Sequence, residues 1–421
     1  MRIAVLVVAL AAGLFDQPPG EFNLSFPAGD LGYFSSASAP SDKPSPLLVL
    51  LASGLESGAA RAALDKWRGA ASARGWLAIA PYGQYKGKEG WGDGSVLMLE
   101  AVLKDTRSRL GADPAHVYLV AFEAATPMAF YVASRAPDLI AAAIAVEGNP
   151  GDAIATNRLF GANTALAPVL WAIEPPTQSA SDPYLRKLKS VSYNVVIHSA
   201  QGLTESAALD WLARRRLDPY PLKVDCETGS LEFNRCYWVR ITRFDAGQRN
   251  DALETTRVPP GSGAYLALGG FGYKTSAPGP GVPVEWLPEN YKGPLKLRDR
   301  IVSVAGRAVE DPASYIALME EMIEEKNVAI MVQRGKERVR LETRIMLPKR
   351  EEVQTARVQA EYFPDTKEVL VISRQVAELR LDLPAHFLPA RLNWNGNDAG
   401  PVDRPGCWLL AVGAQARACG E

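Results

Sequence analysis

Three glutamates occupy positions at which α/β proteins commonly carry catalytic or ligand-binding side chains. Glu123, Glu147 and Glu174 each follow a short apolar run that predicts a buried strand. The carboxyl ends of parallel strands meet at one edge of a sheet, so the three carboxylates are candidates for one shared site. Such a cluster could hold a cation or a cationic ligand, and a carboxylate can attack an acyl carbon. The alternative is that all three side chains point into solvent, the usual place for glutamate. The sequence offers no other metal candidates and predicts no cofactor.

The elements that must position these residues alternate regularly over the first half of the chain. Apolar runs typical of strands buried on both faces are Pro46–Gly54, Trp76–Ala80, Val117–Val120, Ile140–Val146 and Val169–Ile173. Helix-length segments between them are Ala59–Ala73, Ser95–Leu110 and Pro127–Arg135. This alternation predicts a doubly wound parallel sheet, with chemistry in the residues directly after each run.

The stretch VYLVAFEAATPMAFYVASRAPDLIAAAIAVEG, residues 117–148, carries the sharpest pattern. It resembles the strand, turn and helix of α/β-hydrolases of the esterase, polyester-depolymerase and prolyl-peptidase kind. In those families the turn reads GxSxG and exposes a nucleophilic serine. Here the five positions read AFEAA, so Glu123 replaces the serine and both glycines are absent. The resemblance also places LLASG, with Ser53, at the oxyanion loop and covers residues 21–220.

The other catalytic positions of that family are altered as well. Glu174 precedes two prolines where the family carries its acid a few residues later, and the catalytic histidine aligns near Gln201. His198 lies inside an apolar run and is expected at a strand end. Loss of the serine and the histidine removes the group that accepts and returns a proton, so we expect an inactive domain. The alternative is an active esterase or peptidase with an unconventional site around Glu123.

The second half contains the stretch LKLRDRIVSVAGRAVEDPASYIALMEEM, residues 295–322. It resembles a PDZ domain of the bacterial protease-associated type, and the match covers residues 258–346. Asp299 and Gly306 keep the family pattern, whereas Arg298 and Ala305 depart from it at the Gly and Asn positions. Two alternating runs at residues 328–345 predict the closing hairpin.

PDZ domains bind peptide C-termini by strand addition and hold the terminal carboxylate with main-chain N–H groups of a glycine-rich loop. The resemblance therefore implies that peptide or protein C-termini are the partners. Ligand side chains would lie between a strand at Phe271–Thr275 and a helix at Ala313–Ile323. The candidate peptide-binding residues are Gly269, Gly270, Phe271, Gly272, Tyr273, Tyr315 and Met319. The alternative for the loop is an ordinary glycine-rich turn.

The remaining segments predict all-β structure. Residues 221–257 alternate like a hairpin, and residues 347–421 alternate again through VLVISRQVAELRLDL. The two segments are faintly similar, which favours one β-sandwich interrupted by the PDZ-like insertion. The predicted fold is therefore multidomain: a doubly wound α/β-hydrolase-like domain, a PDZ-like α+β domain and an all-β C-terminal segment.

The N-terminus predicts export to the periplasm or the medium. Arg2 precedes an apolar run from Ile3 to Leu10 and a stretch of small residues, so residues 1–20 are expected to be a secretory signal and tail. A buried first strand is the alternative. The four cysteines form two closely spaced pairs, Cys226 with Cys236 and Cys407 with Cys419, which would be disulfides in an oxidising compartment or else buried thiols.

Charge and hydropathy restrict the partners further. Lys and Arg total 46 against 47 for Asp and Glu, so no basic field exists to attract nucleic acid. No apolar run after the signal is long enough for a membrane helix. The sequence thus predicts an exported binding or scaffold protein, with a hydrolase of unconventional chemistry and a regulatory partner of an envelope protease as alternatives.

Overall fold

The computed structural model describes residues 20–26, 29–84, 90–92, 94–274, 277–349 and 353–420. Of the predicted signal and tail, residues 1–19 lie outside the described part of the chain. The chain divides into two compact units. Unit 1 comprises Met1–Pro175, Leu188–Val258 and Gln354–Glu421, and unit 2 comprises Pro176–Lys187 and Pro259–Val353. Within the described residues, no helix is long and apolar enough to cross a membrane.

The first part of unit 1, here called the sheet domain, is built on one eight-stranded sheet with the order β1-β2-β4-β3-β5-β6-β7-β8. Its strands are β1 (Gly20–Phe26), β2 (Gly29–Ser35), β3 (Ser45–Leu51), β4 (Leu77–Gly83), β5 (Ala112–Phe122), β6 (Ala142–Val146), β7 (Val169–Ile173) and β8 (Val195–Ser199). Strands β3 to β8 run parallel to their neighbours, whereas β2 is antiparallel to both β1 and β4. The structure thus confirms the predicted parallel sheet.

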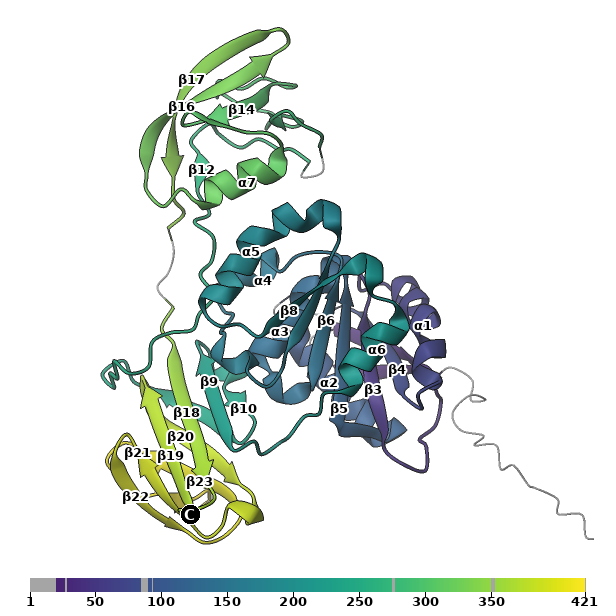
Figure 1. Cartoon of the computed structure of the whole chain (residues 1–421), viewed down its shortest axis with the longest axis vertical. Coiled ribbons are helices and arrows are strands. Elements are labelled where there is room, and N and C mark those ends of the chain that lie inside the picture. The colour runs from purple at the N-terminus through teal and green to yellow at the C-terminus, as the bar shows by residue number, and fades with distance from the viewer. Residues whose placement is uncertain are drawn as a thin grey trace, which may run out of the picture. The chain divides into compact units, whose positions relative to one another are not determined.

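Helices cover both faces of this sheet (Figure 1). They are α1 (Ser57–Ser72), α2 (Ser95–Leu110), α3 (Thr126–Arg135), α4 (Gly151–Ala155) and α6 (Glu205–Ala213), while α5 (Gln178–Ser190) starts in unit 2 and ends in unit 1. Helix α1 packs beside α6, and α2 beside α3. In α1 the buried residues Ala60, Leu64, Trp67 and Ala71 recur every three or four positions, which gives the helix one apolar face.

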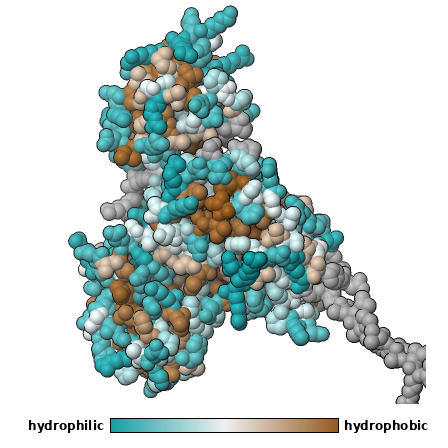
Figure 2. All heavy atoms as spheres, in the orientation of Figure 1, coloured by the Kyte–Doolittle hydropathy of each residue, from teal (hydrophilic) through white to brown (hydrophobic). Residues whose placement is uncertain are grey.

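Strand β8 forms one edge of the sheet. On the face shown in Figure 2, apolar side chains gather in a patch at the middle of the view, over the sheet domain. Val196 of β8 stays 40% exposed. The sheet is therefore less completely covered at this edge than in its centre, where Leu48, Val120 and Ile144 are fully buried.

The second part of unit 1 is a β-sandwich of two five-stranded sheets, with the orders β10-β11-β20-β23-β24 and β22-β21-β19-β18-β9. Its strands are β9 (Lys223–Thr228), β10 (Arg235–Cys236), β11 (Val239–Phe244), β18 (Ala356–Phe363), β19 (Glu368–Arg374), β20 (Val376–Leu383), β21 (Ala390–Trp394), β22 (Asn397–Val402), β23 (Gly406–Ala411) and β24 (Arg417–Ala418). Strand β9 pairs with β18, and β11 pairs with β20.

These pairings join residues 221–257 to the C-terminal segment, so the structure confirms a single sandwich interrupted by the intervening residues. Both predicted cysteine pairs are disulfides, Cys226–Cys236 and Cys407–Cys419. The alternative of four buried thiols is therefore wrong.

Besides the first part of α5, unit 2 contains a sheet with the order β12-β17-β16-β14-β13 and the helix α7 (Pro312–Glu320). Its strands are β12 (Tyr265–Leu266), β13 (Val282–Pro283), β14 (Arg300–Val304), β15 (Arg307–Ala308), β16 (Lys326–Arg334) and β17 (Glu337–Met346). Helix α7 begins at a capping box between Asp311 and Ser314. The antiparallel pair β16–β17 confirms the predicted closing hairpin.

Two predicted boundaries in unit 2 were wrong. The helix expected over residues 313–323 ends at Glu320. The strand expected at 271–275 is reduced, among the described residues, to an isolated bridge between Gly272 and Trp286, and Thr275 lies outside them. Glycines at 269, 270 and 272 explain the shortened strand, since glycine weakens β-structure.

Candidate functional site

Glu123 lies on a sharp turn between the central strand β5 and helix α3, as the sequence predicts. Its φ is +48°, in the left-handed region that few residues other than glycine adopt. Gly148, at the end of the neighbouring strand, packs closely against this turn. A Cβ atom on Gly148 would lie 2.4 Å from the carbonyl oxygen of Glu123. The backbone thus has the strained strand-to-helix geometry of a nucleophile elbow.

The carboxylates at this edge of the sheet do not form a metal site. Glu123, Glu147 and Glu174 follow the adjacent strands β5, β6 and β7, and all three side chains are exposed. Within the described residues there is no group of three or more His, Cys, Asp or Glu residues that could hold a metal ion. The structure therefore favours the solvent-facing interpretation of these glutamates.

The other predicted catalytic positions also lie at the carboxyl ends of strands. Ser53 follows β3 and Gln201 follows β8, and both are exposed. His198 is part of β8, and its ring Nδ1 lies 2.7 Å from the carbonyl oxygen of Ser199. His198 pairs in register with Ala172 of β7, and Ala172 in turn pairs with Val146 of β6. Val146 pairs with Phe122 of β5, the residue before Glu123. Three strand spacings separate the two backbones by about 14 Å, too far for His198 to serve Glu123 as a base.

A cavity of about 550 Å³ lies in unit 2. Its walls come from the segment around β12, the glycine-rich loop that follows and helix α7. Six of the seven predicted peptide-binding residues line it: Gly269, Gly270, Phe271, Tyr273, Tyr315 and Met319. The seventh, Gly272, does not line the cavity, because it faces away and pairs with Trp286.

The glycine-rich loop presents consecutive backbone donors. The N–H group of Gly272 donates to the carbonyl of Trp286 at 2.9 Å. By contrast, the N–H groups of Gly269, Gly270 and Phe271 have no acceptor in the described part of the chain. Both Gly269 and Gly270 are exposed, so these donors can reach a ligand. Successive free N–H groups form a concave site for an anion.

Tyr291 fixes the shape of this loop. Its hydroxyl donates to the carbonyl of Leu268 at 2.5 Å and accepts from the N–H of Leu295 at 3.2 Å. The ring packs against Gly269, where a Cβ atom would lie 2.9 Å from ring carbon Cε2. Gly269 also has a φ of +79°. Position 269 therefore requires glycine for both space and conformation.

The deeper wall of the cavity is apolar. The rings of Tyr273 and Tyr315 meet edge to face with 5.8 Å between centroids. Burial, followed by the proximity of Tyr273, raises the pKa of Tyr315, so its hydroxyl stays neutral at physiological pH. Tyr315 and Met319 are buried on the groove side of α7. The cavity therefore combines a rim of backbone N–H groups with an apolar interior.

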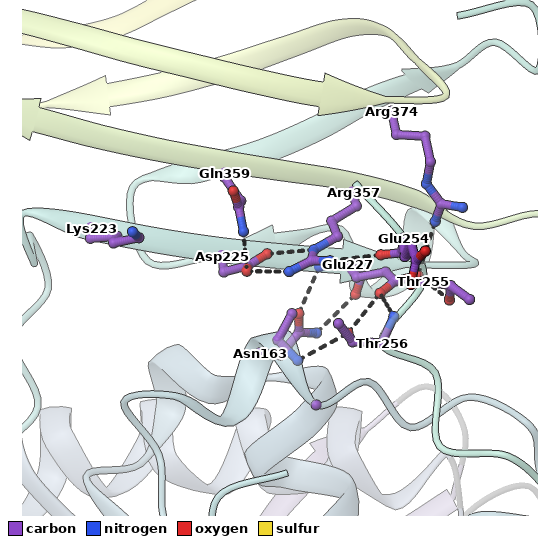
Figure 3. A network of polar contacts seen from close by, with 12 residues as sticks. Asn163, Lys223, Asp225, Glu227, Glu254, Thr255, Thr256, Arg357, Gln359 and Arg374 are labelled. Atoms are coloured by element: carbon purple, nitrogen blue, oxygen red, sulfur yellow. Dashed lines mark hydrogen bonds and ion pairs between the residues drawn. The ribbon is translucent and has the colours of Figure 1, made fainter. Parts of the chain in front are cut away.

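A second cavity of about 550 Å³ lies in unit 1 between the sheet domain and the β-sandwich. Its polar wall is a network that sequence analysis missed (Figure 3). Arg357 of β18 donates from Nε and Nη2 to the two carboxylate oxygens of Asp225 on β9, at 2.9 and 2.6 Å. Gln359 donates to the same carboxylate at 2.8 Å. The polar side chains of this strand pair therefore satisfy one another.

Glu227, which is fully buried at 0% exposure, anchors the same network. Its carboxylate accepts from the hydroxyl groups of Thr255 and Thr256 and from Nη2 of Arg374. Its backbone N–H donates to Asn163 of the sheet domain at 2.7 Å. A buried carboxylate needs partners of this kind, so we assign the network to docking the sandwich on the sheet domain. The only sequence signal was the polar alternation in β9.

Comparison with known proteins finds the chain similar to solved structures alone. No protein-family model matches it, and no curated protein does. Solved structures similar to it include a thermostable esterase, with 14% identity and a TM-score of 0.36 over 48% of this chain. The match covers 64% of that esterase, so the chain spans less than two thirds of its length.

Two further solved structures show the same level of similarity. S-formylglutathione hydrolase from Staphylococcus aureus has 10% identity and a TM-score of 0.35, covering 46% of this chain and 98% of the enzyme. The 2,6-dihydroxy-pseudo-oxynicotine hydrolase has 11% identity and a TM-score of 0.37, covering 46% and 67%. The similarity to hydrolase structures thus extends over about half of the chain.

Proposed function

We propose that this chain is an exported protein that captures peptide or protein C-termini in a PDZ-like unit 2 and carries an inactive α/β-hydrolase-like domain. The observation that carries the proposal is the rim of the unit 2 cavity. Three consecutive backbone N–H groups, from Gly269 to Phe271, have no acceptor in the described part of the chain. They stand beside an apolar cavity large enough for a side chain.

A terminal carboxylate is the ligand that best fits this rim. Unlike an internal peptide carbonyl, it carries a full charge, and hydrogen bonds from N–H groups to a charged acceptor are stronger than those between neutral groups. A peptide entering along residues 271–274 can add its backbone to the edge of the sheet and place its last side chain in the cavity. The chemistry therefore selects a chain end with an apolar last residue.

The hydrolase-like domain supports a binding role because, among the described residues, no histidine lies beside its elbow. Glu123 keeps the backbone of a nucleophile elbow, yet Gln201 stands in place of the histidine and His198 lies about three strand spacings away. Without an imidazole near the elbow, the acyl-transfer cycle has no proton carrier. An intact fold without this chemistry is consistent with a scaffold.

The two disulfides support export. Structural disulfides persist in oxidising compartments such as the periplasm and are rare in reducing cytosol. Both disulfides lie in the β-sandwich: Cys226–Cys236 joins β9 of one sheet to β10 of the other, and Cys407–Cys419 links β23 to the residue after β24. Together with the apolar N-terminal run they support a location outside the cytoplasm.

Calorimetric titration of the full chain with C-terminal peptides tests the proposal. Peptides with an apolar last residue should bind, and amidation of their terminus should weaken binding roughly tenfold or more, since each hydrogen bond to a charged group contributes about 1.5 to 3 kcal/mol. Gly270→Val should have a similar effect, because its bulk shields the loop donors. The nearest atom to a Cβ at Gly270 is Pro288 Cγ at 3.8 Å, so the variant should fold.

The matched control is Lys336→Val, an exposed position in the β16–β17 turn that does not line the cavity. It should leave affinity unchanged. Equal binding of free and amidated peptides, or no binding by any peptide, would mean that the loop is only a turn.

The retained elbow geometry at Glu123 favours one alternative, a hydrolase that uses this carboxylate as its nucleophile. A screen of the native chain and of Glu123→Ala with ester and peptide substrates separates the two functions. We expect no turnover by either protein. Turnover by the native chain that disappears in Glu123→Ala would establish the alternative.

A further inference from the structure

A second aromatic surface lies directly behind the loop that lines the unit 2 cavity. Gly272 and Trp286 form a bridged pair, in which each N–H donates to the carbonyl of the other, at 2.9 and 3.2 Å. Residues paired in this way carry their side chains on the same face. A Cβ atom on Gly272 would lie 3.2 Å from Cβ and 3.5 Å from Cε3 of Trp286. The indole therefore lies next to the space that a side chain at position 272 would occupy.

This face is opposite to the cavity. Phe271 and Tyr273, the neighbours of Gly272, both line the cavity, and successive residues of an extended chain point to alternate faces. Trp286 is 58% exposed. It lies across Gly272 from the edge to which a peptide strand would add, and its accessible indole can be reached over the glycine.

We infer that Trp286 contacts the penultimate side chain of the captured peptide and selects for an aromatic residue there. The inference rests on the proposed function. A carboxylate held at Gly269–Phe271 puts the last side chain into the cavity, so alternation turns the penultimate side chain to the face of Gly272 and Trp286. Glycine at 272 leaves the indole face unobstructed for this contact.

The chemistry of the surface favours an aromatic partner over a charged one. A large flat indole gains most from another ring, through buried area and offset or edge-to-face contact. The charged neighbours Lys274 and Glu285 are both exposed and of opposite sign, so they give no net preference for a charged residue. Trp286 thus becomes a specificity-determining residue outside the cavity itself.

A purely structural role for Trp286 makes a different prediction. An aromatic side chain packed across from a strand glycine can stabilise the sheet by covering the gap. In that case its removal lowers the stability of unit 2 and weakens all peptides alike. Under this structural role, any preference for one penultimate residue would not depend on Trp286.

The experiment uses the full chain and two peptides that are identical except for Phe or Ser at the penultimate position, both with a free carboxylate and an apolar last residue. The native chain should bind the Phe peptide roughly two- to tenfold more tightly, the range expected for one aromatic pair. Trp286→Ala should abolish this preference and leave the affinity for the Ser peptide unchanged. Trp286→Phe should keep part of the preference.

The possible failures are distinguishable. If Trp286→Ala weakens both peptides equally, or if the preference persists in it, Trp286 only covers Gly272 and the inference is overturned. If neither peptide binds, or amidation of the terminus has no effect, the proposed function itself fails and the inference falls with it. Thermal unfolding of Trp286→Ala, measured in parallel, separates a stability loss from a change in preference.

Discussion

The elbow of the sheet domain and the glycine-rich loop of unit 2 each preserve a backbone geometry, but they differ in what that geometry delivers. The elbow at Glu123 positions one side chain, so exchanging that side chain is enough to remove serine chemistry. The loop at residues 269–271 positions main-chain N–H groups, which need no particular side-chain chemistry but do need the space that glycine leaves. The elbow therefore depends on which functional group one residue carries, whereas the loop depends on the absence of side-chain bulk.

The same contrast extends to positions where the resembled families use small turn residues. Arg298 has a φ of +70° and Ala305 a φ of +53°, at the places where PDZ domains carry Gly and Asn. Glu123 at the elbow has a φ of +48°. At each of these three positions a residue other than glycine adopts the left-handed conformation, which costs about 1 to 2 kcal/mol. Surrounding packing must therefore enforce these turns.

The largest expected effect tests the buried ion pair of unit 2, between Asp299 and Arg334. Asp299 is 1% exposed, accepts from Nε and Nη2 of Arg334 at 2.9 and 2.8 Å, and accepts from the N–H of Lys296 at 2.8 Å. Asp299→Ala should lower the free energy of unfolding of unit 2 by about 3 kcal/mol, because it leaves a partly buried guanidinium unpaired. Urea unfolding followed by hydrogen exchange would assign the loss to unit 2.

The control for this change is an exposed ion pair of the same unit. Glu321 accepts from Nη1 of Arg307 at 2.7 Å, with about half of each side chain exposed. Glu321→Ala should change stability by less than about 1 kcal/mol. An Asp299→Ala effect no larger than this control would show that the stability of unit 2 does not depend on the buried pair.

The second effect tests whether the fold requires the backbone geometry of the elbow at Glu123. In Gly148→Ala the new Cβ would lie 2.4 Å from the carbonyl of Glu123, and Gly148 has a φ of +124°. Unit 1 should lose about 2 kcal/mol of stability, since backbone rather than a flexible side chain is in the way. Peptide affinity of unit 2 should not change.

Gly69→Ala in helix α1 is the matched control for this substitution. A Cβ there meets no atom within 4 Å, so the variant should be neutral or more stable by up to about 1 kcal/mol. If Gly148→Ala behaves like Gly69→Ala, the close approach of the two strand ends does not constrain the elbow.

Local patterns in the sequence predicted the sheet domain and the elbow because both depend on short segments. Apolar runs and the turn after Val120 fix the strand, the turn and the helix within a few neighbouring residues. The glycine-rich loop was singled out in the same way, from the spacing of its glycines before Asp299, and its role in peptide binding stays a prediction. Its strand was overestimated because three glycines in four residues favour no regular structure.

Residues that meet across long separations could not be predicted. Asp225 and Arg357 pair across an inserted unit, and a single chain shows no sign of such a partner beyond polar alternation. Trp286 was not singled out because its proximity to Gly272 depends on how the intervening loop folds back. Tertiary pairing, rather than residue type, gives these side chains their roles.

The smallest effect compares the elbow and unit 2 directly, by restoring glycine at one strained turn in each. Glu123→Gly and Arg298→Gly should each raise stability by up to about 1 kcal/mol, because relief of the left-handed strain exceeds the extra flexibility that glycine gives the unfolded chain. Gly306 is an example of a position where the chain already has glycine in this conformation, with a φ of +80°. Thermal unfolding of the two variants is compared with that of the alanine variants Glu123→Ala and Arg298→Ala. Alanine removes the side chain but keeps the backbone strain, so the difference between glycine and alanine measures the strain.

Equal stability of the glycine and alanine variants at position 123 would mean that the elbow is not strained. The left-handed conformation of Glu123 would then need another cause, such as a retained role for the carboxylate. A gain at Arg298 without one at Glu123 would place that role in the sheet domain and weaken its assignment as an inactive scaffold.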